Sequence, residues 1–504
     1  MKIHLLSISN FCFFLCMQGV ISSAQNAAYT FPVQNNTYLN ALAEGPDHSI
    51  VLAGNIDFGN ANRQGLLGKF SSDGTWEWGF QMQSPNLIVD FLRILKLPDG
   101  DFLAGGNDGN TIILVKFSDQ GNVVWQRSIS AGTLSLKMVD FVLQDQQIWM
   151  VGNFDDTHGI LFAIKPDGNL VPNRALQFHK YDYTYPTRIR MSGNNLVITG
   201  SVHSSDSSIL SEGFITLLNT DLSMVKSWSL GGDGNQQVTS LATDGTDIII
   251  GLENQQPTST GIIKMDGNGN ITWSHALDGL YLRGIYSTSN HDLLFTGGVG
   301  DLNKLTSAGS WLGGINFFSS GSIPIRSFDA ESGINLLSGA PNSQPTPYNI
   351  YLFRLDSDLQ PFCNSWNFTY QIDELNMPLQ ELTWITSKDI SLNVETIDRP
   401  MTNAEFEVSV LCQETSGTRS LLPERFQIHP NPFSEQFSIR IPEDWPACKL
   451  SIWTVDGMLL ANLRAPVSGQ LMWNLPDLPS GVYFLKCSNQ LGAITRKILK
   501  VSGD

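Results

Sequence analysis

The feature that most constrains the fold is a strand motif ending in glycine, which recurs seven times along the 504 residues. Each copy is an apolar run followed by glycine, as in HSIVLAG and NLVITG; the glycines are Gly54, Gly105, Gly152, Gly200, Gly251, Gly297 and Gly339. Their spacing of roughly 48 residues, with several short strands in each unit, is typical of β-propeller blades rather than helical solenoids. The repeat predicts an all-β chain built on a seven-bladed β-propeller.

Each repeat contains more than the glycine strand. Behind it comes a strand, a turn rich in Asp, Gly and Asn, and a second strand that often ends in Trp, as in KFSSDGTWEW and IKMDGNGNITW. Such turns suit hairpins because Gly and Asn tolerate positive φ. A further strand lies upstream, as in LRILKLPDGDFLAGG. Four strands per repeat make one blade, and blades stack in a ring because a single blade cannot bury both of its faces.

Three placements follow from this ring. We expect the repeat glycines to lie on an inner strand, where crowding near the axis demands close backbone approach. The segment AAYTFPVQNNT (27–37) resembles a final blade strand, so we expect it to close the ring by pairing with the seventh blade. Large Trp side chains at the ends of the repeats should pack between neighbouring blades; they are Trp78, Trp125, Trp228, Trp273, Trp311 and Trp366.

The rest of the chain divides by composition. The N-terminus has Lys2, an apolar stretch and small residues before Gln25, the pattern of a secretory signal peptide cleaved after Ala24. No later apolar run approaches the ~18 residues of a membrane-spanning helix, so we expect no transmembrane segment in the mature chain. The predicted divisions are a signal peptide at 1–24, the propeller at 25–369, an irregular closing β-segment at 370–412, a linker at 413–423 and a C-terminal domain at 424–504.

Four cysteines remain once the leader is removed. In an exported chain they are disulfide candidates, and four cysteines permit three pairings. The most economical pairing joins neighbours, Cys363 with Cys412 and Cys448 with Cys487. Four unpaired buried thiols are the alternative.

The C-terminal residues carry a series of motifs in a fixed order: a Pro-Asn-Pro turn, a hairpin with a Val-Asp-Gly turn, the strand GVYFLK and a final basic strand. The alternation within these runs predicts a small antiparallel β-sandwich. The order resembles the type A C-terminal sorting domain of the type IX secretion system of Bacteroidota. The positions that match its motifs are Asn431, Pro432, Asp456, Gly457, Gly481, Tyr483, Lys497 and Lys500.

This resemblance implies a route and its partners. The chain would enter the periplasm, cross the outer membrane through the type IX translocon and meet the sorting protease that removes the domain. It would then be secreted or attached to the cell surface. The resemblance implies nothing about the activity of the propeller, because such domains are attached to enzymes, adhesins and scaffolds alike.

The body of the chain offers no chemical motif. A net charge of −17 argues against nucleic acid as a partner, since phosphate binding needs clustered Lys and Arg. DGNGN (266–270) begins like a calcium loop but lacks its Gly and Glu, so we interpret it as a hairpin turn. FHKYDYTYPTRIR (178–190) is the densest aromatic and basic cluster, which we interpret as an ordinary loop between the third and fourth blades. We therefore assign no catalytic residue, no metal ligand and no cofactor.

Two functional hypotheses remain. The first is an exported, non-catalytic propeller that binds an unidentified protein or glycan. The alternative is an extracellular hydrolase or lyase that acts on polysaccharide. Several carboxylates converging on the ring axis would favour the enzyme, whereas an apolar or plugged axis would favour binding.

Overall fold

The structure is a computed structural model that describes residues 27–501 with gaps, of which the longest are 317–324, 341–347, 356–365, 414–426 and 442–448. The chain forms two compact units, Met1–Glu414 and Thr415–Asp504. Every described element is a β-strand except one short 3-10 turn, η1 (Pro46–His48). The protein is thus all-β, as the sequence predicts.

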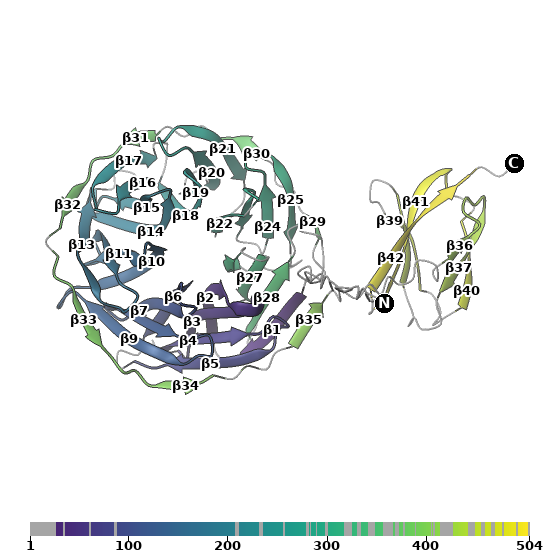
Figure 1. Ribbon diagram of the computed structural model, residues 1–504. Helices are drawn as coiled ribbons and strands as arrows, with labels where there is room; N and C mark the ends of the chain where they lie inside the picture. The colour runs from purple at the N-terminus through teal and green to yellow at the C-terminus, as the bar shows by residue number, and fades with distance from the viewer. Residues whose placement is uncertain are drawn as a thin grey trace, which may run out of the picture. The chain divides into compact units, whose positions relative to one another are not determined.

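The described part of the first unit is a propeller of seven five-stranded sheets, seen along its axis in Figure 1. In six sheets, four consecutive antiparallel strands run from the axis outward, and a short fifth strand from residues 366–403 pairs with the outermost one.

In each of the first three sheets the strands follow one another from the axis outward. The first contains β2 (Asn36–Glu44), β3 (Ile50–Asp57), β4 (Arg63–Phe70), β5 (Trp76–Met82) and β34 (Met401–Asn403). The second contains β6 (Val89–Lys96), β7 (Phe102–Asp108), β8 (Thr111–Phe117), β9 (Val123–Ser130) and β33 (Asn393–Thr396). The third contains β10 (Leu136–Gln144), β11 (Gln147–Phe154), β12 (His158–Ile164), β13 (Leu170–His179) and β32 (Ile385–Ser387).

The next three sheets have the same order. The fourth contains β14 (Tyr183–Ser192), β15 (Asn195–His203), β16 (Glu212–Asn219), β17 (Met224–Leu230) and β31 (Leu379–Glu381). The fifth contains β18 (Gln236–Asp244), β19 (Asp247–Gln255), β20 (Thr258–Met265), β21 (Ile271–Asp278) and β30 (Ile372–Glu374). The sixth contains β22 (Gly284–Ser287), β23 (Leu293–Thr296), β24 (Asp301–Leu305), β25 (Trp311–Asn316) and β29 (Trp366–Asn367).

The seventh sheet joins the two ends of the unit. It consists of β26 (Ile325–Asp329), β27 (Ile334–Ala340), β28 (Tyr348–Leu355), β1 (Ala27–Val33) and β35 (Ser409–Gln413), in that order. The N-terminal strand β1 pairs antiparallel with β28, from Ala27 opposite Arg354 to Val33 opposite Tyr348. The expected closure of the ring by the N-terminal segment is confirmed.

Nearly every innermost strand carries a β-bulge, and this bulge explains the repeat glycines. The register of β10 shifts between Met138 and Asp140, directly opposite Gly152. A Cβ on Gly152 would lie 1.9 Å from the carbonyl oxygen of Lys137, which no backbone tolerates. The repeat glycines that lie within strands are on the second strand from the axis, an inner strand of each sheet. Gly54, Gly152 and Gly200 make room there for the bulged neighbouring strand. Gly251 instead lies opposite Ser240, the residue after the bulge, and a Cβ there would meet side chains.

In the second sheet the glycine opposite the bulge is not the expected one. Gly106 holds this position rather than Gly105, because the bulge of β6 lies opposite it. A Cβ on Gly106 would lie 1.9 Å from the carbonyl oxygen of Asp90, whereas one on Gly105 would meet side chains.

Tryptophan side chains join neighbouring sheets, as expected. The indole Nε1 of Trp78 on β5 donates to the Asp119 carbonyl oxygen in the next sheet, at 3.0 Å. Trp125 on β9 makes the same bond to Pro166 at 3.2 Å, and Trp273 on β21 bonds Ser307 at 3.1 Å. In each case an outermost strand reaches the turn of the following sheet, so one indole provides both apolar contact and a hydrogen bond.

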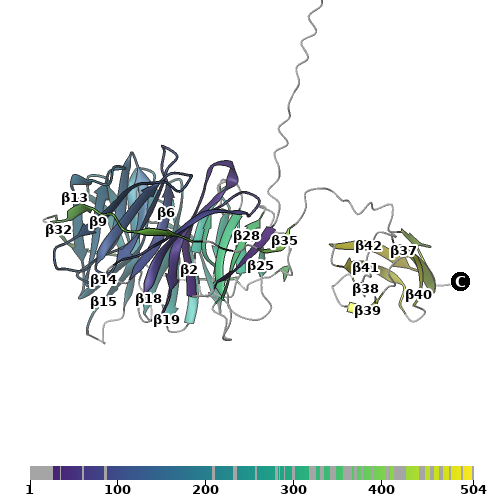
Figure 2. The ribbon, with the colours of Figure 1, turned by 90° about the horizontal axis from the view of Figure 1, so that it is seen from below.

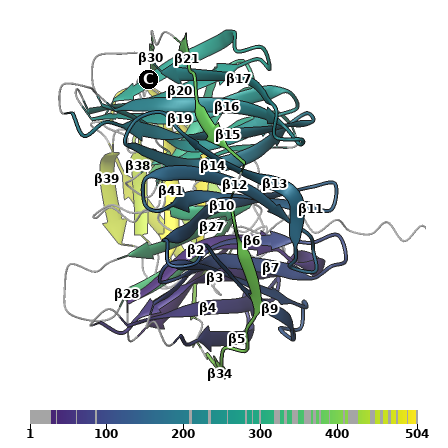
Figure 3. The same ribbon diagram turned by 90° about the vertical axis from the view of Figure 1, so that its left-hand side faces the viewer.

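Residues 366–413 form a belt around the ring. Its strands β29 to β34 pair with the sixth to the first sheets in descending order, and β35 pairs with the seventh. The belt therefore passes around the ring in the direction opposite to that of the preceding chain. The green strands in Figure 2 and Figure 3 show the belt crossing the outside of the sheets. The described part of 370–412 lies in this belt, and its strands extend six of the seven sheets instead of forming a sheet of their own.

Two belt side chains reach deep into the ring. The indole of Trp384 is 8 % exposed, packs edge-on against Phe178 and Phe214, and donates to the hydroxyl oxygens of Thr216 (3.0 Å) and Ser227 (2.8 Å). It thereby contacts both the third and the fourth sheets.

Arg399 forms a second anchor between the belt and the second sheet. Its Nη2 lies 2.9 Å from Oδ2 of the buried Asp108. Its backbone N–H and C=O are both bonded to the side-chain amide of Gln126. The belt is therefore held by side chains as well as by strand pairing.

The second unit is a small β-sandwich. Its three-stranded sheet contains β36 (Gln427–His429), β37 (Gln436–Ile441) and β40 (Gly469–Asn474). Its four-stranded sheet contains β39 (Leu459–Arg464), β38 (Lys449–Trp453), β41 (Gly481–Asn489) and β42 (Gly492–Lys500). The buried core between the sheets includes Phe433, Phe437, Ile452, Leu485 and Ile498. The predicted antiparallel sandwich is confirmed.

Candidate functional site

A hollow of about 250 Å³ lies where the innermost strands of the propeller meet. Residues of β2, β6, β10, β14, β18 and β22 line it, so six sheets contribute to one site. Its charged lining residues, among those that the structure describes, are Arg93, Asp140, Arg188 and Arg190. The hollow matches neither pattern that would separate the two functional hypotheses: one carboxylate, not several, lies among the described lining residues, and the lining is charged rather than wholly apolar.

The bulges of the inner strands place these charges at one level of the ring. The residue that follows the bulge is Arg93 on β6, Asp140 on β10 and Arg188 on β14. The same position is Ala41 on β2 and Ser240 on β18. A bulge turns the side chain that follows it away from the regular alternation of the strand. Repeated in neighbouring sheets, it brings unlike residues to equivalent places around the axis.

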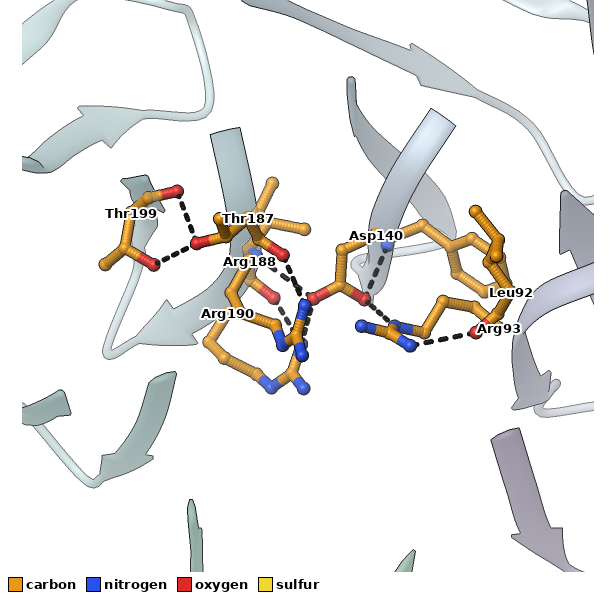
Figure 4. A network of polar contacts seen from close by, with 9 residues as sticks. Leu92, Arg93, Asp140, Thr187, Arg188, Arg190 and Thr199 are labelled. Atoms are coloured by element: carbon orange, nitrogen blue, oxygen red, sulfur yellow. Dashed lines mark hydrogen bonds and ion pairs between the residues drawn. The ribbon is translucent and has the colours of Figure 1, made fainter. Parts of the chain in front are cut away.

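Asp140 is the centre of the polar network in Figure 4. Its carboxylate is 1 % exposed and accepts four hydrogen bonds. Oδ1 accepts from Arg93 Nε at 2.7 Å and from the backbone N–H of Phe141 at 3.0 Å. Oδ2 accepts from Arg190 Nη1 at 2.8 Å and from the backbone N–H of Ile189 at 3.2 Å. The full set of donors satisfies this buried charge.

The electrostatics of the hollow keep Asp140 ionised. Burial alone would raise the pKa of its carboxyl group, but the positive charges of Arg190, Arg93 and Arg188 outweigh it and lower the pKa to about 2. Asp140 is therefore a permanent anion at neutral pH, and its oxygens are occupied. It is suited to holding the arginines in place, not to transferring protons.

Arg188 differs from its two neighbours. Its Nη1 donates to the Thr187 carbonyl oxygen at 2.7 Å, and it forms no ion pair with any carboxylate among the described residues. Protein atoms surround it, yet part of its side chain stays exposed because it lines the hollow. Burial, and then the charge of Arg93, lower the pKa of Arg188 to about 9, so the guanidinium still carries its proton at neutral pH.

The sequence did not identify these residues as a site. Arg188 and Arg190 fall within 178–190, and the interpretation of that stretch as a loop is wrong, because β14 begins at Tyr183 and is the innermost strand of its sheet. The available signal was positional: Arg93, Asp140 and Arg188 all lie in the strand upstream of a repeat glycine. Aligning the repeats by that strand would have placed the three charges in one column.

The aromatic part of the same stretch forms a separate group. The rings of Tyr183 and Tyr185 stack with centroids 6.1 Å apart, and Tyr185 lies edge-on to His203 at 5.4 Å. His158 meets His179 in the same manner at 4.5 Å. Burial, and then the proximity of His179, lower the pKa of His158. These aromatic rings contact one another, so we interpret the cluster as side-chain packing.

The predicted hairpin turn at 266–270 is confirmed. Gly269 N–H donates to the Asp266 carbonyl oxygen, and the turn joins β20 to β21. Among the residues that the structure describes, no three His, Cys, Asp or Glu side chains come together as a metal site would require. In the same part of the chain, no helix is long and apolar enough to cross a membrane.

In the second unit, Asn431 joins the first turn to the last strand. Its Nδ2 donates to the Lys497 carbonyl oxygen at 2.9 Å, and its Oδ1 accepts from the Leu499 N–H at 2.8 Å. Pro432 follows it and is exposed.

The other described motif residues lie along the final hairpin. Gly481 and Lys500 are opposite each other at the open end of β41 and β42, and Tyr483 Oη donates to the Pro479 carbonyl oxygen at 2.7 Å. Lys500 Nζ donates to the carbonyl oxygens of Ser434 and Leu475. The Asp456-Gly457 turn lies outside the described residues. The described motif residues thus join the first turn of the sandwich to its last strand, β42.

The signal cleavage site at Ala24 also lies outside the described residues, as do Cys363 and Cys448. Cys412 lies in β35, opposite Ala28 of β1. Cys487 is fully buried in the core of the sandwich. Both disulfide pairings remain predictions.

Several solved structures are similar to this chain at low identity. PorZ, an essential bacterial surface component of the type IX secretion system of Porphyromonas gingivalis, is 13 % identical over 92 % of this chain and 59 % of its own length, with a TM-score of 0.43. The Dos1 propeller is 10 % identical over 63 % of this chain and 78 % of its own, with a TM-score of 0.40. BamB from Moraxella catarrhalis is 11 % identical over 63 % and 84 %, with a TM-score of 0.36. The chain spans less than two thirds of the length of PorZ.

Sequence comparison identifies the second unit. No curated protein gave a significant match to the chain. The family described as "Secretion system C-terminal sorting domain" matches residues 427–501, which are the strands of the sandwich from β36 to β42. The chain therefore carries a type IX secretion system C-terminal sorting domain behind its propeller, and it is exported to the cell surface or secreted.

Proposed function

We propose that this protein is a non-catalytic binding protein of the cell exterior, whose propeller holds its ligand in the hollow on the ring axis. The observation that carries the proposal is the state of Asp140, whose two oxygens accept four hydrogen bonds at the centre of the hollow. The site is charged, and the oxygens of its one described carboxylate are already occupied by hydrogen bonds. Those properties suit recognition, which needs preorganised donors, more than proton transfer.

The requirements of glycoside hydrolysis favour a binding role over a hydrolase. Most glycosidases need two carboxyl groups flanking the bond, one of them with a raised pKa so that it can donate a proton. Among the described lining residues Asp140 is the one carboxylate, and its pKa is lowered to about 2. A group with that pKa is a poor acid catalyst at neutral pH.

The lyase alternative rests on a different residue. Tyr286 on β22 lines the same hollow as the three arginines. In a β-elimination, cations neutralise the carboxylate of an acidic sugar while a base removes the neighbouring proton. Tyr286 is the candidate for that base, and the test below includes this outcome.

The delivery route belongs to the same proposal. A signal peptide cleaved after Ala24 would take the chain to the periplasm of a member of the Bacteroidota, and the type IX translocon would carry it across the outer membrane. The sorting protease would then remove the domain that contains residues 427–501. The propeller would be left outside the cell as the active part.

The test is a screen of the purified full chain against neutral and acidic glycans and polysaccharides, with binding and product release measured on the same samples. We expect binding without product, reduced when Arg188 and Arg190 are both changed to Met. Arg127→Met is the matched control, because Arg127 lies on the outer strand β9 over the ring of Trp125. Release of shortened or unsaturated sugars would contradict the proposal, and loss of the unsaturated product in Tyr286→Phe would identify a lyase.

A further inference from the structure

We propose that the axial hollow is an oxyanion site, which takes a carboxylate, sulfate or phosphate group carried by a small molecule or by the end of an acidic sugar. The inference rests on the proposed function, since it names the ligand class of the same site. Arg188 would bind the anion directly, while Arg93 and Arg190 would complete the positive surroundings.

The described lining of the hollow carries an excess of positive charge. Three guanidinium groups and one carboxylate are the charged lining residues among those that the structure describes, so positive charge is in excess there. The chain as a whole carries a net charge of −17. A cationic hollow in an acidic protein is a local arrangement, not a consequence of composition. Like charges brought together in a region of low dielectric repel one another strongly. A bound anion would relieve that repulsion.

The three arginines of the hollow differ in their hydrogen-bond partners. Asp140 bonds Arg93 and Arg190, each of which also donates from Nη1 to a backbone carbonyl oxygen. Arg188 has the Thr187 carbonyl oxygen as its acceptor, and no carboxylate within the described residues pairs with it. A guanidinium group presents five N–H donors in a planar fork that fits the oxygens of a carboxylate or phosphate. Arg188 is therefore the arginine that Asp140 does not hold, and most of its donors remain available to a ligand.

The positive charge of Arg188 is costly without a ligand. Burial and the neighbouring Arg93 lower the pKa of Arg188, which means that the surroundings disfavour its charge. An anion bound beside Arg188 in the hollow would offset that cost.

The size and the rest of the lining limit the ligand. A hollow of about 250 Å³ is smaller than the ~300–1,000 Å³ of sites for drug-sized molecules, so it admits one compact group or one sugar ring. Much of the remaining lining is apolar, including Leu95, Val142 and Ile285. Such walls weaken competition from water and strengthen each bond to the anion.

The test measures thermal unfolding and calorimetric binding of the full chain with sulfate, phosphate, glucuronate, glucose and chloride at equal ionic strength. We expect a saturable rise in Tm, on the order of 3 °C at a hundredfold excess over Kd, for oxyanions but not for chloride or glucose. Stronger binding of sulfate or phosphate would indicate a free inorganic anion, and stronger binding of glucuronate an acidic sugar.

Three variants make the test specific. Arg188→Met should weaken oxyanion binding by about tenfold or more, since it removes charge-assisted hydrogen bonds. It should still fold, because Arg188 forms no ion pair with a carboxylate among the described residues and part of its side chain is exposed. Arg188→Lys keeps the charge but loses the planar fork, so its affinity should lie between those of Arg188→Met and the unaltered chain. Arg127→Met should bind as the unaltered chain does.

The possible results separate this inference from the proposed function. An equal Tm in oxyanions and chloride, or oxyanion binding that survives in Arg188→Met, would overturn the inference. Neutral glycan binding that Arg188→Met leaves intact would also overturn it, while the binding role of the propeller would stand. Turnover of an acidic glycan that depends on Arg188 would support the anion site and overturn the non-catalytic function.

Discussion

At the scale of single residues, Asp140 shows how one carboxylate organises a cationic site. It forms ion pairs with arginines from the sheets on either side of its own, Arg93 on β6 and Arg190 on β14. A buried ion pair adds little net stability when desolvation is included, but the loss of one partner is costly. Asp140 therefore fixes the positions of the arginines and makes their accumulation tolerable.

This role predicts a pH dependence of stability. The pKa of Asp140 falls from 3.8 to about 2 in the folded chain, so below pH ~4 the unfolded chain binds a proton more readily than the folded chain. Its contribution, on the order of 2 kcal/mol, is fully present above pH ~4 and is lost as the pH falls through ~2. Urea unfolding across this range should show the loss.

Asp140→Asn should be less stable at neutral pH, and the part of the acid-range decline that belongs to Asp140 should disappear. The exposed Asp47 in the η1 turn provides the control, since Asp47→Asn should leave the profile unchanged. An unaltered acid profile in Asp140→Asn would show that the arginines do not depend on this carboxylate.

Residue by residue, the sequence predicted what the repeats share and missed what differs between them. Repeat glycines such as Gly54, Gly152 and Gly200 were visible because the same steric conflict with the innermost strand recurs in their sheets. Arg93, Asp140 and Arg188 occupy equivalent positions but are different residues, so no repeat signal marks them. Their shared feature is the bulge before them, which depends on strand register and has no fixed residue type.

At the scale of elements, the belt is the unexpected part of the fold. Strands with clear alternation and hairpin turns were predicted, as was the closing strand β1. The belt strands are short, mostly three to five residues, so two-residue alternation has no length in which to show itself. Their positions depend on backbone pairing and on a few side chains such as Trp384.

Trp384 gives the belt a testable anchor. Trp384→Ala should destabilise the propeller by about 3–5 kcal/mol, because it removes a buried indole from between Phe178 and Phe214 and leaves two hydroxyl groups without its N–H. The measurement is the midpoint of chemical unfolding.

The adjacent Ile385 is the matched control. It begins β32 but is 59 % exposed, so Ile385→Ala should change stability by no more than about 0.5 kcal/mol. Equal midpoints for Trp384→Ala and the unaltered chain would mean that the belt is held by strand pairing alone.

At the scale of the whole molecule, the belt predicts a difference between two truncations. A chain that ends after Gln413 retains β29 to β35, and we expect it to fold as a stable monomer without the sorting domain. A chain that ends after Leu355 lacks the belt strands, so the outer edge of every sheet has no partner strand. Exposed strand edges promote association.

The two truncated chains can be compared by size-exclusion chromatography and by amide hydrogen exchange of β5, β9, β13 and β17. We expect the shorter chain to self-associate and to exchange faster in these strands. Equal protection in both chains would show that the ring is complete without its belt.

The position of β1 between β28 and β35 also fixes the order in which the fold can be completed. The seventh sheet joins residues 27–33 to residues 409–413, so its last seam forms between strands from opposite ends of the unit's sequence. Contacts so distant in sequence form slowly, because a long loop must close before they are made. Neither end of the unit can complete this sheet alone, so the ring closes only when its first and its last strands are both present.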